Sequence, residues 1–135
     1  NLAPQLADPT RSLLPSGLAG CCYTRPTALS AETIECYLAP LASSPLRKKQ
    51  LHDYCIALAE NPLVALEPAL RESPVPLRVV WGTGDTIFSA ASPDWLDRTF
   101  PHSRGVRRIE GANLFFPEEM PEVIAEEARA LWGVG

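Results

Sequence analysis

The sequence has few basic residues, a single methionine and no long apolar run. Its 135 residues hold 12 lysines and arginines against 16 aspartates and glutamates, a net charge of −4 at pH 7. Proteins that bind nucleic acid cluster Lys and Arg to neutralise phosphates, and the longest basic run here is Arg47-Lys48-Lys49. No stretch approaches a membrane span, and no signal-peptide pattern opens the chain. We therefore expect a cytoplasmic protein with neither a nucleic-acid nor a membrane partner.

Methionine and cysteine add two further expectations. The sole methionine is Met120 and the sequence begins at Asn1, so we expect a processed product, a cut fragment or an excised domain. The cysteines show no C-x-x-C or Cys/His spacing for zinc, and we predict no metal site. Small, buried, reduced core residues of a cytosolic protein are the favoured interpretation, with a disulfide framework as the alternative. The four positions are Cys21, Cys22, Cys36 and Cys55.

The distribution of prolines and apolar residues divides the chain into three segments. Residues 1–29 contain four prolines and several polar breaks, and they predict an irregular or briefly helical lead-in. Residues 30–73 predict helices, and residues 74–135 predict alternating strands and helices. A chain of this length is one domain's worth and long enough for a real core.

Serine caps mark the helix starts in residues 30–73. Ser30 predicts the N-cap of a helix that runs through Leu38 and stops at Pro40. Ser44 followed by Pro45 predicts a second, stronger start. The apolar residues of that helix recur at i, i+3, i+4 and i+7, which places Leu51, Tyr54, Cys55 and Leu58 on one face. A further short helix is predicted to carry Leu63, Leu66 and Leu70.

Residues 74–135 change to a strand and helix alternation. Residues 77–81 predict a strand that ends at the 82–85 turn, and Ser92-Pro93 predicts a helix through about Phe100. A second strand is predicted over residues 106–109, then a turn over 111–119 and a helix that begins at Pro121. This order predicts an α/β fold with a βαβ unit of parallel strands. The buried side of the last helix is expected to comprise Val123, Ile124, Ala128 and Leu131.

Two parallel strands do not make a stable sheet by themselves. Parallel sheets are covered by helices on both faces, and an open strand edge needs a pairing partner. We expect that partner to be a missing N-terminal half or a second copy of the chain.

Two turns carry a resemblance to a known superfamily. The stretch Trp81-Gly82-Thr83-Gly84-Asp85 is similar to the W-G-x-x-D turn that holds the acid of the α/β-hydrolase triad. The stretch G-A-N-L-F-F-P-E-E-M-P-E over residues 111–122 is similar to the G-x-H-x-x-x-x-E-x-P turn that holds the base. From Ser30 to Trp132 the element order resembles the C-terminal portion of an α/β-hydrolase of the haloalkane dehalogenase, epoxide hydrolase or esterase-like branch. The resemblance implies that residues 30–73 are a cap-like helical segment and residues 74–135 the C-terminal βαβα of the core.

The resemblance assigns a position to two residues. Asp85 stands at the position of the triad acid, whose carboxylate orients a histidine and stabilises its protonated form. The alternative for Asp85 is a turn aspartate that caps its own backbone. Asn113 stands at the position of the catalytic histidine, and an amide neither takes up nor releases a proton near neutral pH.

Three explanations compete for Asn113. The histidine was replaced to trap an inactive enzyme, the branch naturally lacks it, or another histidine substitutes. We favour natural absence, since the surrounding turn is intact. The two candidates for substitution are His52, on the cap-like helix, and His102, which we expect to lie away from the carboxyl ends of the strands.

Other polar and aromatic residues near the two turns have structural interpretations. Glu118 and Glu119 precede a helix, where they are expected to complement the helix dipole, and no spacing supports pairing Asp85 with Glu118 in a two-carboxylate mechanism. Trp81 and Trp95 are expected to belong to the core rather than to a pocket.

No serine has the strand–turn–helix context of a nucleophile elbow. The resemblance therefore implies the C-terminal fragment of an α/β-hydrolase-like protein whose parent hydrolyses an ester, epoxide, halide or C–C bond in a small-molecule substrate. Such a fragment is expected to be inactive alone and to need no cofactor and no metal. The alternative is a non-catalytic hydrolase-like binding or interaction protein.

Overall fold

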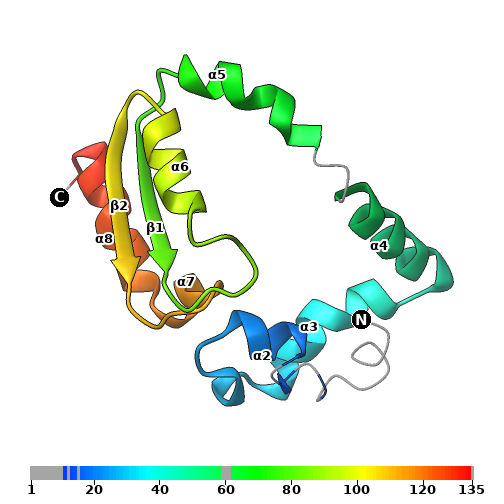
Figure 1. Cartoon of the computed structure of the whole chain (residues 1–135). Coiled ribbons are helices and arrows are strands. Elements are labelled where there is room, and N and C mark those ends of the chain that lie inside the picture. The colour runs from blue at the N-terminus through cyan, green and yellow to red at the C-terminus, as the bar shows by residue number, and fades with distance from the viewer. Residues whose placement is uncertain (1–10, 12, 15, 59–61, 135) are drawn as a thin grey trace. The chain divides into compact units, whose positions relative to one another are not determined.

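The computed structural model describes residues 11, 13, 14, 16–58 and 62–134 (Figure 1). The chain forms two compact units. The first comprises Asn1–Gly20 and Arg25–Ala65, and the second comprises Cys21–Thr24 and Leu66–Gly135. Part of the predicted 1–29 lead-in, namely residues 1–10, 12 and 15, lies outside the described residues.

The described part of the first unit is helical. A short helix α2 (Leu18–Cys22) leads out of it into the second unit, and a 3-10 turn η2 (Pro26–Ala28) leads back. Two longer helices follow, α3 (Ala31–Ala42) and α4 (Pro45–Leu58), which pack against each other. Buried side chains here are Ala19, Ile34 and Leu38.

Helix α3 begins where predicted but ends later. Ser30 is its N-cap and its hydroxyl accepts a hydrogen bond from the Thr33 backbone N–H at 3.0 Å. The prediction that Pro40 stops the helix is wrong, because the helix continues to Ala42. A proline in the last turn removes only one intrahelical bond. The Ser43 hydroxyl also donates to the Pro40 carbonyl at 2.8 Å, which satisfies one acceptor left over at the helix end.

Helix α4 also begins as predicted, but its apolar stripe is not buried. The Ser44 hydroxyl caps it by accepting from the Arg47 backbone N–H at 3.2 Å. Tyr54 and Cys55 are exposed and Leu51 is half-buried. The predicted short helix that follows is η3 (Pro62–Leu66) continued by α5 (Glu67–Arg71).

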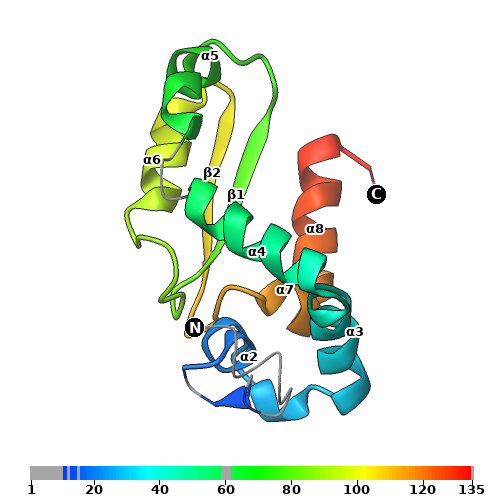
Figure 2. The same cartoon turned by 90° about the vertical axis from the view of Figure 1, so that its right-hand side faces the viewer.

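The second unit is a parallel βαβ unit closed by a helix. Strands β1 (Leu77–Gly82) and β2 (Ser103–Ile109) pair in parallel, and α6 (Ser92–Thr99) connects them. Then follow a one-turn helix α7 (Phe116–Glu119), inside the region predicted as turn, and α8 (Pro121–Trp132). In both views the strands lie between α6 and α8 (Figures 1 and 2). The predicted parallel strands and their connecting helix are confirmed.

Charged side chains fasten α8 to the sheet. Arg78 of β1 binds Glu127 of α8 with a 2.6 Å contact, and Arg107 of β2 reaches the same carboxylate at 2.9 Å. The exposed fraction of the Glu127 side chain is 13%. One carboxylate therefore ties both strands to the helix. Gly133 ends α8 in the left-handed conformation that a helix C-terminus favours.

The cysteine prediction is confirmed for only part of the set. Cys22 is buried and Cys21 half-buried, but Cys36 and Cys55 are exposed, so a core role for the last two is wrong. None of the four is in a disulfide within the described chain. Across the described residues, no helix is long and apolar enough to cross a bilayer.

Candidate functional site

The two turns that carry the resemblance lie side by side at the carboxyl ends of the parallel strands. Thr83 N–H donates to the Ile109 carbonyl at 3.0 Å, and Gly84 N–H donates to the Ala112 carbonyl at 2.9 Å. The Thr83 hydroxyl accepts from Gly111 N–H at 2.8 Å. Carboxyl ends of parallel strands are where α/β proteins assemble their sites. Three hydrogen bonds thus join two turns that are distant in the sequence into one structure.

Two glycines make this close approach possible. A Cβ atom at Gly82 would overlap the carbonyl oxygen of Ala112. A Cβ atom at Gly84 would stand 2.6 Å from Asn113 Oδ1 and 2.7 Å from the Gly111 carbonyl oxygen. Only glycine leaves room for the neighbouring backbone at these distances. The W-G-x-G-D spacing therefore has a packing reason in this chain.

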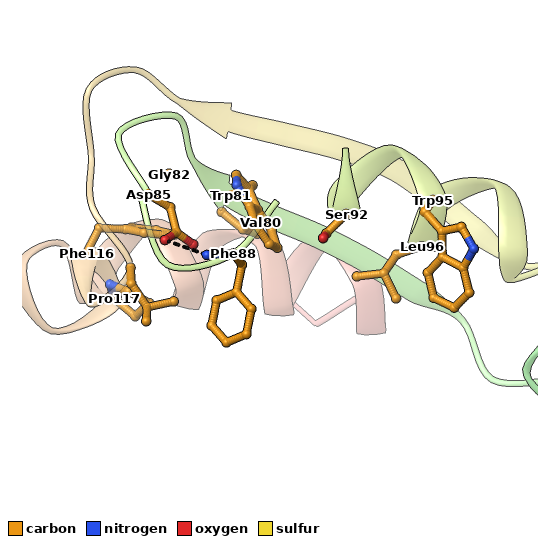
Figure 3. A pocket seen from close by; sticks show the side chains of 11 residues that line it. Val80, Trp81, Gly82, Asp85, Phe88, Ser92, Trp95, Leu96, Phe116 and Pro117 are labelled. Carbon is orange, nitrogen blue, oxygen red and sulfur yellow. Dashed lines mark hydrogen bonds between the residues drawn. The ribbon is translucent and has the colours of Figure 1, made fainter. Parts of the chain in front are cut away.

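The carboxylate of Asp85 caps its own loop. Oδ1 accepts from the backbone N–H of Ile87 at 2.7 Å. It also accepts from that of Phe88 at 3.2 Å (Figure 3). This is the capping role expected as the alternative for a turn aspartate. These hydrogen bonds occupy one oxygen of the Asp85 carboxylate and fix the direction of the side chain. The assignment of Asp85 as the triad acid stays a prediction.

Asn113 is held in place through both its backbone and its side chain. Its N–H donates to Thr24 Oγ1 at 3.0 Å, and its Nδ2 donates to the Tyr23 carbonyl at 3.0 Å. Its Oδ1 lies against Gly84, the residue before Asp85. The structure therefore places Asn113 beside the acid turn, although no recorded hydrogen bond joins the Asp85 and Asn113 side chains within the described chain.

A strap of residues 21–24 holds this second turn. Phe115 N–H donates to the Cys22 carbonyl at 2.7 Å, and the buried ring of Tyr23 meets the ring of Phe115 edge-on at 5.2 Å. The Tyr23 hydroxyl donates to Glu118 at 2.6 Å, and Thr24 N–H donates to Glu119 at 2.9 Å. The strap was not predicted from the sequence, because its residues fall within the segment predicted to be irregular or briefly helical.

The strap changes the interpretation of two glutamates and one cysteine. Glu118 and Glu119 precede α8 as predicted, but they lie within the one-turn helix α7, and their carboxylates bind the strap. Burial, together with the neighbouring Cys21 and the charge of Asp85, raises the pKa of the Cys22 thiol to about 12. That thiol stays protonated at neutral pH and is a poor nucleophile.

One histidine, His102, belongs to the same unit as the two turns, and the other, His52, does not. His102 directly precedes β2, and its carbonyl accepts from Leu77 N–H at the start of β1. It therefore lies at the amino ends of the strands, opposite to Asp85, as expected. His52 belongs to the first unit, where its exposed ring contacts Asp53 at 3.7 Å.

An apolar pocket opens beside Asp85. It has a volume of about 420 Å³ and lies against β1, α6 and the second turn (Figure 3). Asp85, Phe116 and Pro117 stand at one end, Trp95 and Leu96 at the other, and Phe88 between them. Both tryptophans, Trp81 and Trp95, line this pocket, so the core role that we favoured over a pocket is wrong for the exposed Trp95 and incomplete for the half-buried Trp81. The remaining lining residues are Val80, Gly82, Ser92 and Leu114.

Comparison with known proteins adds no relative. The chain matches no protein-family model, no curated protein and no solved structure. Among the described residues, no group of three or more His, Cys, Asp or Glu side chains is arranged to hold a metal ion.

Proposed function

We propose that this chain is the C-terminal portion of an α/β-hydrolase-like protein that acts on a small molecule, and that the chain is inactive alone. The observation that carries the proposal is the pairing of the Gly82–Asp85 turn with the Gly111–Asn113 turn at the carboxyl ends of two parallel strands. A triad needs its acid and its base to meet at such a place, although they are distant in sequence. The cap-like segment, residues 30–73, precedes this core as the resemblance implies.

The second unit supports the proposal through its open edge. The described sheet has only two strands, which is too few for independent stability without more pairing or cover. An N-terminal half with further strands would pair with that edge and would bring the nucleophile elbow and oxyanion donors that this sequence lacks.

Inactivity follows from the chemistry of Asn113. Its amide has no proton to exchange near neutral pH, and its Nδ2 is engaged with the Tyr23 carbonyl. The Cys22 thiol, protonated and buried, offers no replacement nucleophile.

A non-catalytic binding protein is the second candidate, and the same anchoring favours it. Asn113 is held by two hydrogen bonds to the strap, one through its backbone and one through its side chain. This arrangement retains the turn and the pocket while dispensing with proton transfer.

Hydrolysis of p-nitrophenyl acetate tests the proposed inactivity. Asp94→Asn at an equal concentration in the same buffer gives the background rate. The wild-type chain, Asp85→Asn and Asn113→Ala should all release p-nitrophenol at that background rate. A wild-type rate above this background that Asp85→Asn abolishes would overturn the proposal, because Asp85 would then work without a histidine.

A further inference from the structure

The pocket beside Asp85 combines aromatic walls with a single charge. Of its eleven lining residues, Asp85 alone has an acidic or basic side chain, and Ser92 supplies the only hydroxyl. Four aromatic residues surround the hollow: Trp81, Phe88, Trp95 and Phe116. Such a volume, about 420 Å³, is in the range of small-molecule sites.

The charge of Asp85 is not neutralised by a side-chain cation in the described chain. Three arginines of this unit pair with other carboxylates: Arg108 with Asp94 at 2.7 Å, and Arg78 and Arg107 with Glu127. Two backbone amides hold Oδ1, which leaves Oδ2 with no recorded protein partner among the described residues. In a triad the imidazole would take up this capacity, whereas the Asn113 amide donates to the Tyr23 carbonyl.

We propose that this pocket binds an organic ammonium ion with an aromatic or branched apolar body. The ammonium group would pair with Asp85, and the apolar body would lie against Phe88, Leu96 and Trp95. A cation among aromatic faces gains from their quadrupoles, and desolvation inside an apolar pocket strengthens the charge pair. An anion would meet the carboxylate at close range and is excluded.

This inference rests on the proposed function in one respect: position 113 is taken as the base position, where a histidine would otherwise pair with Asp85. The pocket itself, its lining and the direction of the carboxylate come from the geometry of the second unit alone.

Three probes with the same body and different head groups test the proposal. 4-Phenylbutylamine, 4-phenylbutan-1-ol and 4-phenylbutyrate are titrated into the protein at pH 7 by calorimetry, with the fluorescence of Trp81 and Trp95 as a second signal. We expect the amine to bind at least tenfold more tightly than the alcohol, and the carboxylate to bind more weakly than both.

Two variants test whether the Asp85 carboxylate is responsible for the tighter binding of the amine. Asp85→Asn keeps an oxygen that can accept from Ile87 N–H, and it should weaken the amine at least tenfold while leaving the alcohol unchanged. Asp94→Asn removes one negative charge from α6 outside the pocket lining and should leave all three affinities unchanged. Equal binding of amine and alcohol, an amine affinity that Asp85→Asn does not change, or no binding of any probe would overturn the proposal. None of these outcomes bears on the hydrolase-like proposal. That proposal is tested separately, without any ligand, by the pKa of the imidazole in Asn113→His.

Discussion

The Gly84 backbone N–H lies 2.9 Å from the Ala112 carbonyl oxygen, and this bond joins the turn after β1 to the turn after β2. Hydrogen bonds from Thr83 and Gly111 flank it. The position of Asp85 relative to Asn113 depends on this junction. Changes that disturb the junction should therefore act on stability before they act on any chemistry.

The loss of stability caused by alanine at three glycines should follow the space available to the new methyl group. Gly82→Ala should cost about 2–4 kcal/mol, because the new methyl overlaps the Ala112 carbonyl, which is backbone and cannot move aside. Gly84→Ala should cost somewhat less, since one of its two close neighbours is the Asn113 side chain. Gly111→Ala meets no atom within 4 Å and should cost only about 1 kcal/mol, through its φ of +68°. Urea unfolding measures the series, and equal costs at the three positions would contradict the close packing of the turns.

Loss of the Asn113 amide donor should loosen the strap. Asn113→Ala removes the bond to the Tyr23 carbonyl and should cost about 1 kcal/mol of unfolding free energy. Asn113→Asp keeps the shape but places an oxygen against that carbonyl, so it should cost at least as much at pH 7. Thermal unfolding compares the two with wild type. A fully tolerated Asn113→Asp would show that the bond does not form.

The four thiols should differ in their reactivity. Cys22 is buried and its pKa is raised to about 12, so almost none of it is thiolate at pH 7–9. Cys36 and Cys55 are exposed. Treatment with iodoacetamide followed by peptide mass spectrometry should find Cys36 and Cys55 modified and Cys22 protected, with urea removing the protection. Rapid labelling of Cys22 in the folded protein would contradict its burial.

The Glu127 carboxylate should contribute a pH-dependent stabilisation. Hydrogen bonds from Arg78, and then from Arg107, lower its pKa below the ordinary value of about 4.5. A lowered folded-state pKa gives stability that is present above pH 4.5 and lost as the pH falls through the folded value. Glu127→Gln should therefore cost about 1 kcal/mol at pH 7 and progressively less below pH 4.5.

Glu110→Gln is the matched control for that variant. Glu110 is exposed at the end of β2 and has no ion pair recorded in the described chain. The control should follow the wild-type stability curve between pH 3 and pH 8. If the loss of stability in Glu127→Gln stays constant with pH, the ion pairs of Glu127 with Arg78 and Arg107 are not its cause.

Local signals in the sequence predicted the strands and most helix starts. Ser30 and Ser44 identified the starts of α3 and α4 because a serine cap acts within one turn of chain. The alternation of strand and helix after residue 74 predicted the parallel pair because each element has its own periodicity. Pro40 misled the prediction, since a proline near a helix end costs less than one in the middle.

Contacts between distant residues explain what the sequence did not predict. The Tyr23 hydroxyl meets Glu118 across 95 positions, and no local pattern encodes a partner at that separation. The same holds for the pocket, where Trp95 of α6 and Phe116 of α7 face one hollow only after the chain has folded. The roles of Asp85 and Asn113 came from resemblance, and the structure supplies their neighbours.

The most direct test of the account is a titration of Asn113→His by NMR. If the two turns hold acid and base positions, the new imidazole will pair with the Asp85 carboxylate, and its pKa will rise from the ordinary value of about 6.5 to roughly 7.5 or above. The double variant Asp85→Asn/Asn113→His should return it to about 6.5, while Asp94→Asn/Asn113→His should not. An imidazole at position 113 that titrates near 6.5 whether or not Asp85 is present would contradict the account.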